Sequence, residues 1–62
     1  MPIVRIEGPK FKSLDHKRKM VEKITETVSE IFEMPKETVI VILKELEKEN
    51  VGLSGKLVVD RD

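Results

Sequence analysis

The residue with the most unusual chemical potential in this 62-residue chain is the proline at position 2. Aminopeptidases remove an initiator methionine when the next side chain is small, and loss of Met1 would leave Pro2 with a secondary amine. An α-amino group titrates near pH ~8, and desolvation or neighbouring cations lower its pKa further. Pro2 is therefore a candidate general base. The alternative is that Pro2 only starts a strand.

A second feature is a group of cations around the predicted start of a helix. Five of them fall within ten residues, opposed only by Asp15: Lys10, Lys12, Lys17, Arg18 and Lys19. The helix dipole disfavours a cation near a helix N-terminus by ~0.3–1 kcal/mol. This placement favours an anion-binding corner, to which free N–H groups would add. The alternative is a solvated helix edge with ion pairs such as Arg18–Glu22.

Other catalytic and metal-binding arrangements are missing from the sequence. With a single histidine, His16, and no cysteine, neither a tetrahedral zinc site nor a Ser-His-Asp set can be assembled. There is no glycine-rich phosphate loop. We interpret His16 as a surface residue in the first turn of the helix.

The composition predicts a small domain that self-associates. Hydrophobic and charged residues each make up 39% of the chain. A chain this short buries only roughly 60% of its unfolded surface, and without cysteine no disulfide can compensate. Zero formal net charge and the lack of tyrosine and tryptophan argue against a nucleic-acid partner. No apolar run reaches the ~20 residues of a membrane span, and no secretory signal is visible, so we expect a cytoplasmic protein.

Two segments have the pattern of strands. Residues 3–7 alternate as a strand does, and Gly8-Pro9 breaks that pattern. Thr38–Leu43 contains four β-branched residues in a row, which is typical of a strand covered on both faces.

The segment between them has the pattern of a helix. Ser13 is a candidate N-cap, and the helix runs from Leu14 to about Glu33, where Met34-Pro35 ends it. Apolar residues recur there at spacings of three and four, as on one face of a helix. They are Leu14, Met20, Val21, Ile24, Val28, Ile31 and Phe32.

These elements predict an α/β (α+β) fold with a single right-handed βαβ unit and parallel strands, in one domain over residues 1–62. The helix covers one face of the sheet, and we expect a second copy of the protein to cover the other. Residues 49–59 predict a tight glycine-bearing turn between short extended pieces, a C-terminal hairpin that docks on a neighbouring subunit.

Taken together, these features resemble the 4-oxalocrotonate tautomerase (2-hydroxymuconate tautomerase-like) family of very short βαβ enzymes. The resemblance covers essentially the whole chain. It rests on the length, the opening Met1-Pro2-Ile3, the Gly8-Pro9 break, the helix end before Pro35, the strand at 39–43 and the tail at 50–57.

The resemblance implies a tautomerase/MIF-like fold and an isomerase that interconverts enol and keto forms of unsaturated α-keto acids. Pro2 would be the base, and the partner would be a small anionic keto or enol acid. No cofactor or metal is implied. Family members form homo-oligomers, most often hexamers built as trimers of dimers, with sites shared between subunits.

The resemblance also places substrate-binding residues. Lys12 stands at the family's arginine in the loop entering the helix, and keeps the charge without the two-pronged grip on a carboxylate. Ile40 stands at the second arginine, and Val51 at an aromatic residue near the tail turn. Lys10 or Arg5 are candidates to compensate. A dicarboxylate substrate is therefore less favoured here than in better-matched relatives.

Two alternatives stay open. The same amine could run a different reaction, such as hydration or dehalogenation of an unsaturated acid. The chain could also be a non-catalytic oligomeric module that binds an anion through its basic corner.

Overall fold

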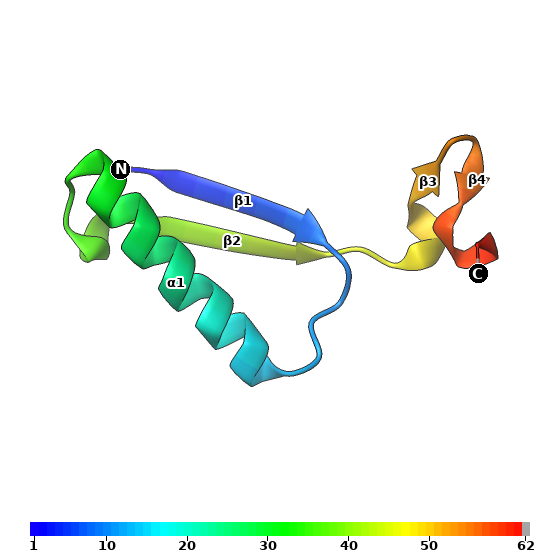
Figure 1. The fold of residues 1–62 in the computed structure, drawn as a ribbon, viewed down its shortest axis with the longest axis horizontal. Coiled ribbons are helices and arrows are strands. Elements are labelled where there is room, and N and C mark those ends of the chain that lie inside the picture. The colour runs from blue at the N-terminus through cyan, green and yellow to red at the C-terminus, as the bar shows by residue number, and fades with distance from the viewer. Residues whose placement is uncertain (62) are drawn as a thin grey trace.

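Two parallel strands form the centre of the fold (Figure 1). β1 (Ile3–Gly8) and β2 (Ile40–Glu45) pair along their whole lengths, beginning with Ile3 opposite Ile40. The computed structural model describes residues 1–61. Gly8 is part of β1, so the predicted break falls at Pro9.

β2 begins and ends two residues later than the predicted strand Thr38–Leu43. Lys36–Thr38 form a 3-10 helix, η1, in which the Thr38 hydroxyl donates to the Pro35 carbonyl oxygen at 2.7 Å. At the other end, Glu45 still pairs with Gly8 of β1. Pairing with the neighbouring strand, rather than hydrophobicity, sets the end of β2.

The crossover helix α1 (Leu14–Phe32) returns the chain to the start of the sheet. The predicted N-cap is confirmed, because the Ser13 hydroxyl oxygen accepts a hydrogen bond from the His16 N–H at 3.2 Å. The helix ends at Glu33, whose φ of 55° lies in the left-handed region. The N–H groups of Glu33 and Met34 donate back to carbonyl oxygens of the last turn, which closes the helix.

The helix α1 lies across one face of the sheet and leaves the other face open (Figure 1). The half-buried side chains between helix and sheet are Val4, Ile6, Val41 and Leu43 from the strands and Met20, Ile24 and Val28 from α1. The opposite face carries Ile3, Arg5, Glu7, Ile40, Ile42 and Lys44, all exposed. None of the described residues is fully buried. One chain alone therefore has no closed hydrophobic core.

Only part of the predicted apolar helix face packs against the chain's own sheet. Leu14 and Phe32 are each 60% exposed, and Ile31 is 76% exposed. Leu14 and Phe32 lie beside the half-buried row around the helix, and Ile31 lies in the last turn. These residues are free to contact another chain.

The C-terminal segment forms the predicted hairpin. β3 (Gly52–Leu53) and β4 (Lys56–Leu57) pair antiparallel, and Ser54 and Gly55 between them have φ values of 54° and 81°. Positive φ at both turn residues is the pattern of a type I′ turn, whose twist matches that of the strands.

The hairpin, flanked by the 3-10 helices η2 (Lys48–Asn50) and η3 (Val58–Asp60), stands away from the sheet and helix (Figure 1). The chain measures 43 × 24 × 14 Å, and its radius of gyration of 14.8 Å exceeds the roughly 11 Å of a compact chain of this length. Over residues 1–61, no helix combines the length and apolar character needed to cross a membrane.

Candidate functional site

Pro2 lies directly before β1, beside the start of β2. Its carbonyl oxygen accepts a hydrogen bond from the Ile40 N–H at 3.0 Å, which extends the parallel pairing by one step. The Pro2 side chain is half-buried, whereas Met1 is 76% exposed. The hydrogen bond from Ile40 thus fixes the carbonyl group of Pro2, whereas the Pro2 nitrogen is joined to the exposed Met1.

Ile40 is the other predicted site residue at this end of the sheet. Its side chain is 38% exposed and lies on the open face, in register with Ile3. An aliphatic side chain cannot hold a carboxylate, so it can supply only an apolar wall. The structure therefore brings together Pro2 and Ile40, and of the predicted cations only Arg5 shares the open face with Ile40.

Acidic residues outnumber basic ones around the Pro2 end of one chain, where η1 contributes Lys36 and Glu37. The helix α1 runs back antiparallel to the strands, so its C-terminal end returns to the end of the sheet where Pro2 lies (Figure 1). Its last turn has no basic residue, and Glu30 and Glu33 lie there. The negative end of the helix dipole and these two carboxylates lie at the same end of the sheet as Pro2.

Of the predicted cations, Arg5 lies within β1 on the open face, opposite Ile42, whereas Lys10 and Lys12 lie at the other end of the sheet. Lys10 and Lys12 belong to the loop that follows β1. β1 has six residues at ~3.3 Å each, so this loop lies about 20 Å from Pro2, beyond the span of a lysine side chain. Val51 lies beyond β2, between η2 and β3. One chain does not bring Pro2 together with Lys10, Lys12 or Val51.

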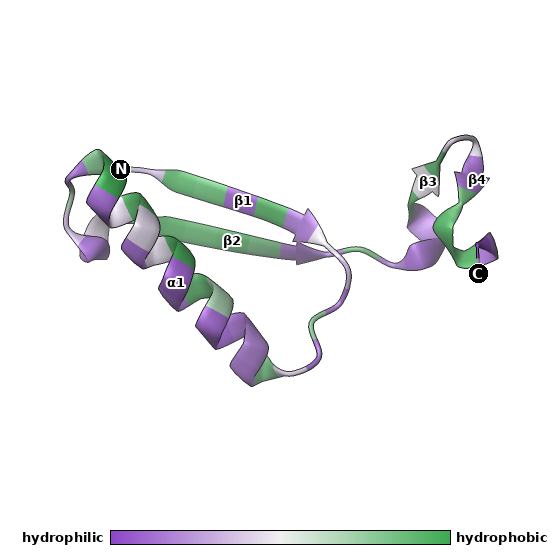
Figure 2. Ribbon diagram, viewed as in Figure 1, coloured by the Kyte–Doolittle hydropathy of each residue, from purple (hydrophilic) through white to green (hydrophobic). Residues whose placement is uncertain are grey.

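Carboxylates pair with three of the five clustered cations. Lys10 Nζ lies 2.9 Å from Glu47 Oε1, and Lys17 Nζ lies 3.3 Å from Glu45 Oε1. Arg18 pairs with Asp15 at 2.7 Å, in place of the expected Glu22. Among residues 1–61, Lys12 and Lys19 have no ion-pair partner, although Figure 2 shows a broadly hydrophilic N-terminal half of α1. The predicted five-cation corner is therefore reduced largely to Lys12 and Lys19.

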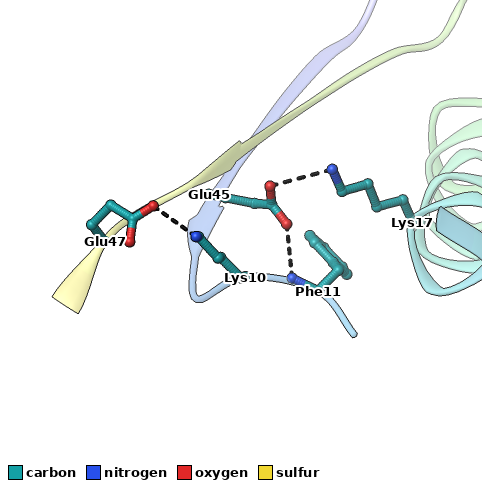
Figure 3. A network of polar contacts seen from close by, with 5 residues as sticks. All are labelled: Lys10, Phe11, Lys17, Glu45 and Glu47. Carbon is teal, nitrogen blue, oxygen red and sulfur yellow. Dashed lines mark hydrogen bonds and ion pairs between the residues drawn. The ribbon is translucent and has the colours of Figure 1, made fainter. Parts of the chain in front are cut away.

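The best-connected polar side chain at this end is Glu45, which the sequence analysis did not single out (Figure 3). Its Oε2 accepts a hydrogen bond from the Phe11 N–H at 2.8 Å, and its Oε1 accepts one from Lys17 Nζ at 3.3 Å. The Phe11 N–H, and secondarily Lys17, hold the pKa of Glu45 below its usual value. The partners are 34 and 28 residues away in sequence, so no spacing rule could reveal them.

Lys10 is held in the same region (Figure 3). Its hydrogen bond to the Glu47 carboxylate, and the attraction between the two charges, raise the pKa of Lys10 above its ordinary value. The pair is exposed on both sides, so it contributes little to stability. An ammonium group that is already paired is less available to a substrate than that of Lys12.

The comparisons with known proteins agree on one family. The model of the tautomerase enzyme family matches residues 2–61. A probable tautomerase from Halalkalibacterium halodurans is 36% identical over 61 residues, covering 98% of this chain and 100% of that protein. The 2-hydroxymuconate tautomerase of Bacillus subtilis is 31% identical over 62 residues, covering 100% of both chains. The crystal structure of YwhB, a homologue of 4-oxalocrotonate tautomerase, matches with a TM-score of 0.92 at 30% identity, covering 98% of this chain and 100% of that one.

Proposed function

We propose that this chain, which belongs to the tautomerase family, is a cofactor-independent isomerase that interconverts enol and keto forms of unsaturated α-keto acids. The observation that carries the proposal is the position of Pro2, half-buried at the start of β1 and held through its carbonyl oxygen. A relative that matches over its whole length is named as a 2-hydroxymuconate tautomerase, which supports the substrate class.

Removal of Met1 converts the Pro2 nitrogen from a tertiary amide into a secondary amine. The neutral amine takes the proton from the enol hydroxyl group of the substrate, and the resulting dienolate then receives a proton from the same nitrogen at a carbon atom. The base is regenerated at the end of each turnover, and no group remains attached to the protein. Because the amine must be neutral at the start and protonated in between, a pKa near the working pH serves it best.

Lys12 supplies the cation for the substrate carboxylate and for the charge that develops on the dienolate. Its ammonium group is exposed and has no ion-pair partner among residues 1–61. Electrostatic stabilisation of this kind is usually the largest single catalytic contribution. Ile40 and Val51 line the site as apolar walls that desolvate the amine, and Lys10 plays a smaller part because Glu47 already holds it.

The site is built from at least two copies of the chain. Pro2 and Lys12 lie at opposite ends of the sheet, and the negative end of α1 lies with Pro2. A second copy that covers the open face around Ile40 and Ile42 gives the chain the core it lacks and brings a cation to the amine. The resemblance to the family favours a hexamer made of three dimers.

The test compares the natural protein with the Pro2→Ala variant after removal of Met1 has been verified by intact mass. We expect Pro2→Ala to lose at least about tenfold in the rate of ketonisation of 2-hydroxymuconate or enolised phenylpyruvate, or ~1.4 kcal/mol of barrier. A second control keeps Met1 in place by an uncleavable N-terminal extension, and should be as inactive as Pro2→Ala. Equal rates for all three proteins would refute the role of Pro2.

A further inference from the structure

Between β1 and the N-cap of α1, the backbone of the loop makes a single hydrogen bond to the rest of the chain. Among the described residues, the segment Pro9–Lys12 makes no backbone–backbone hydrogen bond. Its one backbone hydrogen bond runs from the Phe11 N–H to Glu45 Oε2, at 2.8 Å (Figure 3). The conformation of the loop therefore depends on a side chain from the end of β2.

The Glu45 carboxylate uses its two oxygens on two different elements. Oε2 holds the loop through Phe11, and Oε1 holds the first half of α1 through Lys17 at 3.3 Å. The Glu45 side chain is 30% exposed, the least of the six side chains in the three ion pairs. One carboxylate thus joins the strand, the loop and the helix at the place where the loop carries its cations.

Lys12 follows Phe11 directly. It has no ion-pair partner among residues 1–61, so no salt bridge directs its side chain. A fixed Phe11 amide holds the backbone one residue before Lys12. Restricting a binding group in advance lowers the entropy lost when substrate binds.

We propose that Glu45 is a positioning residue that holds the loop so that the Lys12 ammonium group meets the substrate carboxylate. This inference rests on the proposed function and adds to it a residue that never touches the substrate. Glu45 acts through Lys12, which meets both the substrate carboxylate and the charge on the dienolate, so its removal raises the KM for a carboxylate substrate and also lowers kcat.

The experiment is a double-mutant cycle on the assembled protein, with Glu45→Ala, Lys12→Ala and the double variant. We expect Glu45→Ala alone to raise KM by roughly 3–30-fold, and to have little further effect in the Lys12→Ala background. A purely structural role would give effects that add. Glu26→Ala is the matched control, because Glu26 is an exposed glutamate of α1 without an ion-pair partner in the described chain, and it should leave KM unchanged.

Two further measurements keep the proposal testable if Glu45→Ala does not fold. Glu45→Gln retains an oxygen for the Phe11 N–H but loses the charge that attracts Lys17, so its KM should lie between those of the natural protein and Glu45→Ala. Hydrogen exchange at the Phe11 amide should be slow in the natural protein and faster in Glu45→Gln, whose neutral amide oxygen accepts a weaker hydrogen bond than the carboxylate. An unchanged Phe11 exchange rate would overturn the proposal.

Pro2→Ala in the same assay separates the two claims. Full activity in Pro2→Ala overturns the proposed function, and this inference with it. An inactive Pro2→Ala combined with additive effects of Glu45→Ala and Lys12→Ala overturns only the role of Glu45. An inactive Pro2→Ala with non-additive effects supports both.

Discussion

The two ends of the sheet formed by β1 and β2 carry different side chains and opposite ends of the α1 dipole. The end where the strands begin carries Pro2 and Ile40, together with the negative end of α1. The end where they finish carries the loop with Lys12, the positive end of α1, and the Glu45 and Lys10 ion pairs. We expect the base to come from one end and the Lys12 cation from the other, so the proposed site needs a second copy of the chain.

The open face of the sheet gives the most severe test of this comparison. Ile42→Lys places a charge on the open face beside Ile40 and Ile3, and costs the assembly the ~1.5–3 kcal/mol that burial of an isoleucine side chain contributes in each copy. We expect a monomeric or unfolded chain without measurable activity, checked by sedimentation equilibrium. Thr27→Lys, on an exposed position of α1, should leave both assembly and activity intact. A folded, active Ile42→Lys monomer would contradict the account.

Removal of Lys12, which has no ion-pair partner among residues 1–61, should have the next largest effect. Lys12→Ala should lose about 10–100-fold in kcat/KM, the magnitude of a lost charge-assisted hydrogen bond. Lys10→Ala should lose less, because Glu47 already holds the Lys10 ammonium group. Lys12→Arg should match or exceed the natural protein, since a guanidinium group grips a carboxylate with two hydrogen bonds. A larger loss of kcat/KM in Lys10→Ala than in Lys12→Ala would show that Lys10, and not Lys12, is the main ligand of the substrate carboxylate.

The contacts of Glu45 with Phe11 and Lys17 should make the free energy of unfolding depend on pH in the acid range. The pKa of Glu45 is lowered in the folded chain, first by the Phe11 N–H and then by Lys17. The stability that this shift contributes is complete above the unfolded pKa of ~4.3 and is lost as pH falls through the lower folded pKa. Unfolding free energies of the natural protein and Glu45→Gln should therefore differ at neutral pH and converge in acid. A difference that stays constant down to about pH 2 would contradict this reading.

The smallest effects concern the two ends of α1. Ser13→Ala removes the N-cap and should lower the free energy of unfolding by ~0.5–2 kcal/mol. Glu33→Gly relieves the left-handed backbone at the other end, and should raise that free energy by about 0.5–1 kcal/mol. Urea denaturation at one fixed protein concentration measures both. A destabilising Glu33→Gly would show that the glutamate side chain makes contacts that offset its backbone strain.

The elements of the fold could be predicted because local rules govern them. Ser13 caps the helix as its residue type suggests, and the alternation of residues 3–7 places Val4 and Ile6 on the face that α1 covers. The limits of β2 could not be predicted, because pairing with β1 draws Lys44 and Glu45 into the strand despite their polarity. Likewise, the helical spacing of apolar residues did not predict that Leu14, Ile31 and Phe32 of α1 would stay exposed rather than pack against the sheet.

In the candidate site, too, single residues could be predicted from the sequence but their contacts could not. Pro2 could be singled out from its residue type and position alone, and Lys12 from the family resemblance. The partners of Lys10, Lys17 and Glu45 could not, because they join segments that only the folded chain brings together. The roles of Pro2, Lys12, Ile40, Val51 and Lys10 in binding or catalysis remain predictions.

In the proposed site, the base Pro2 and the cation Lys12 come from different copies of the chain. Pro2→Ala and Lys12→Ala proteins can be unfolded, mixed in equal amounts and refolded together. If the site is shared, random mixed assemblies should regain activity, up to about a quarter of that of the natural protein, although each variant alone is impaired. If each chain supplies both residues to its own site, the mixture will be no more active than the average of the two variants, and the account fails.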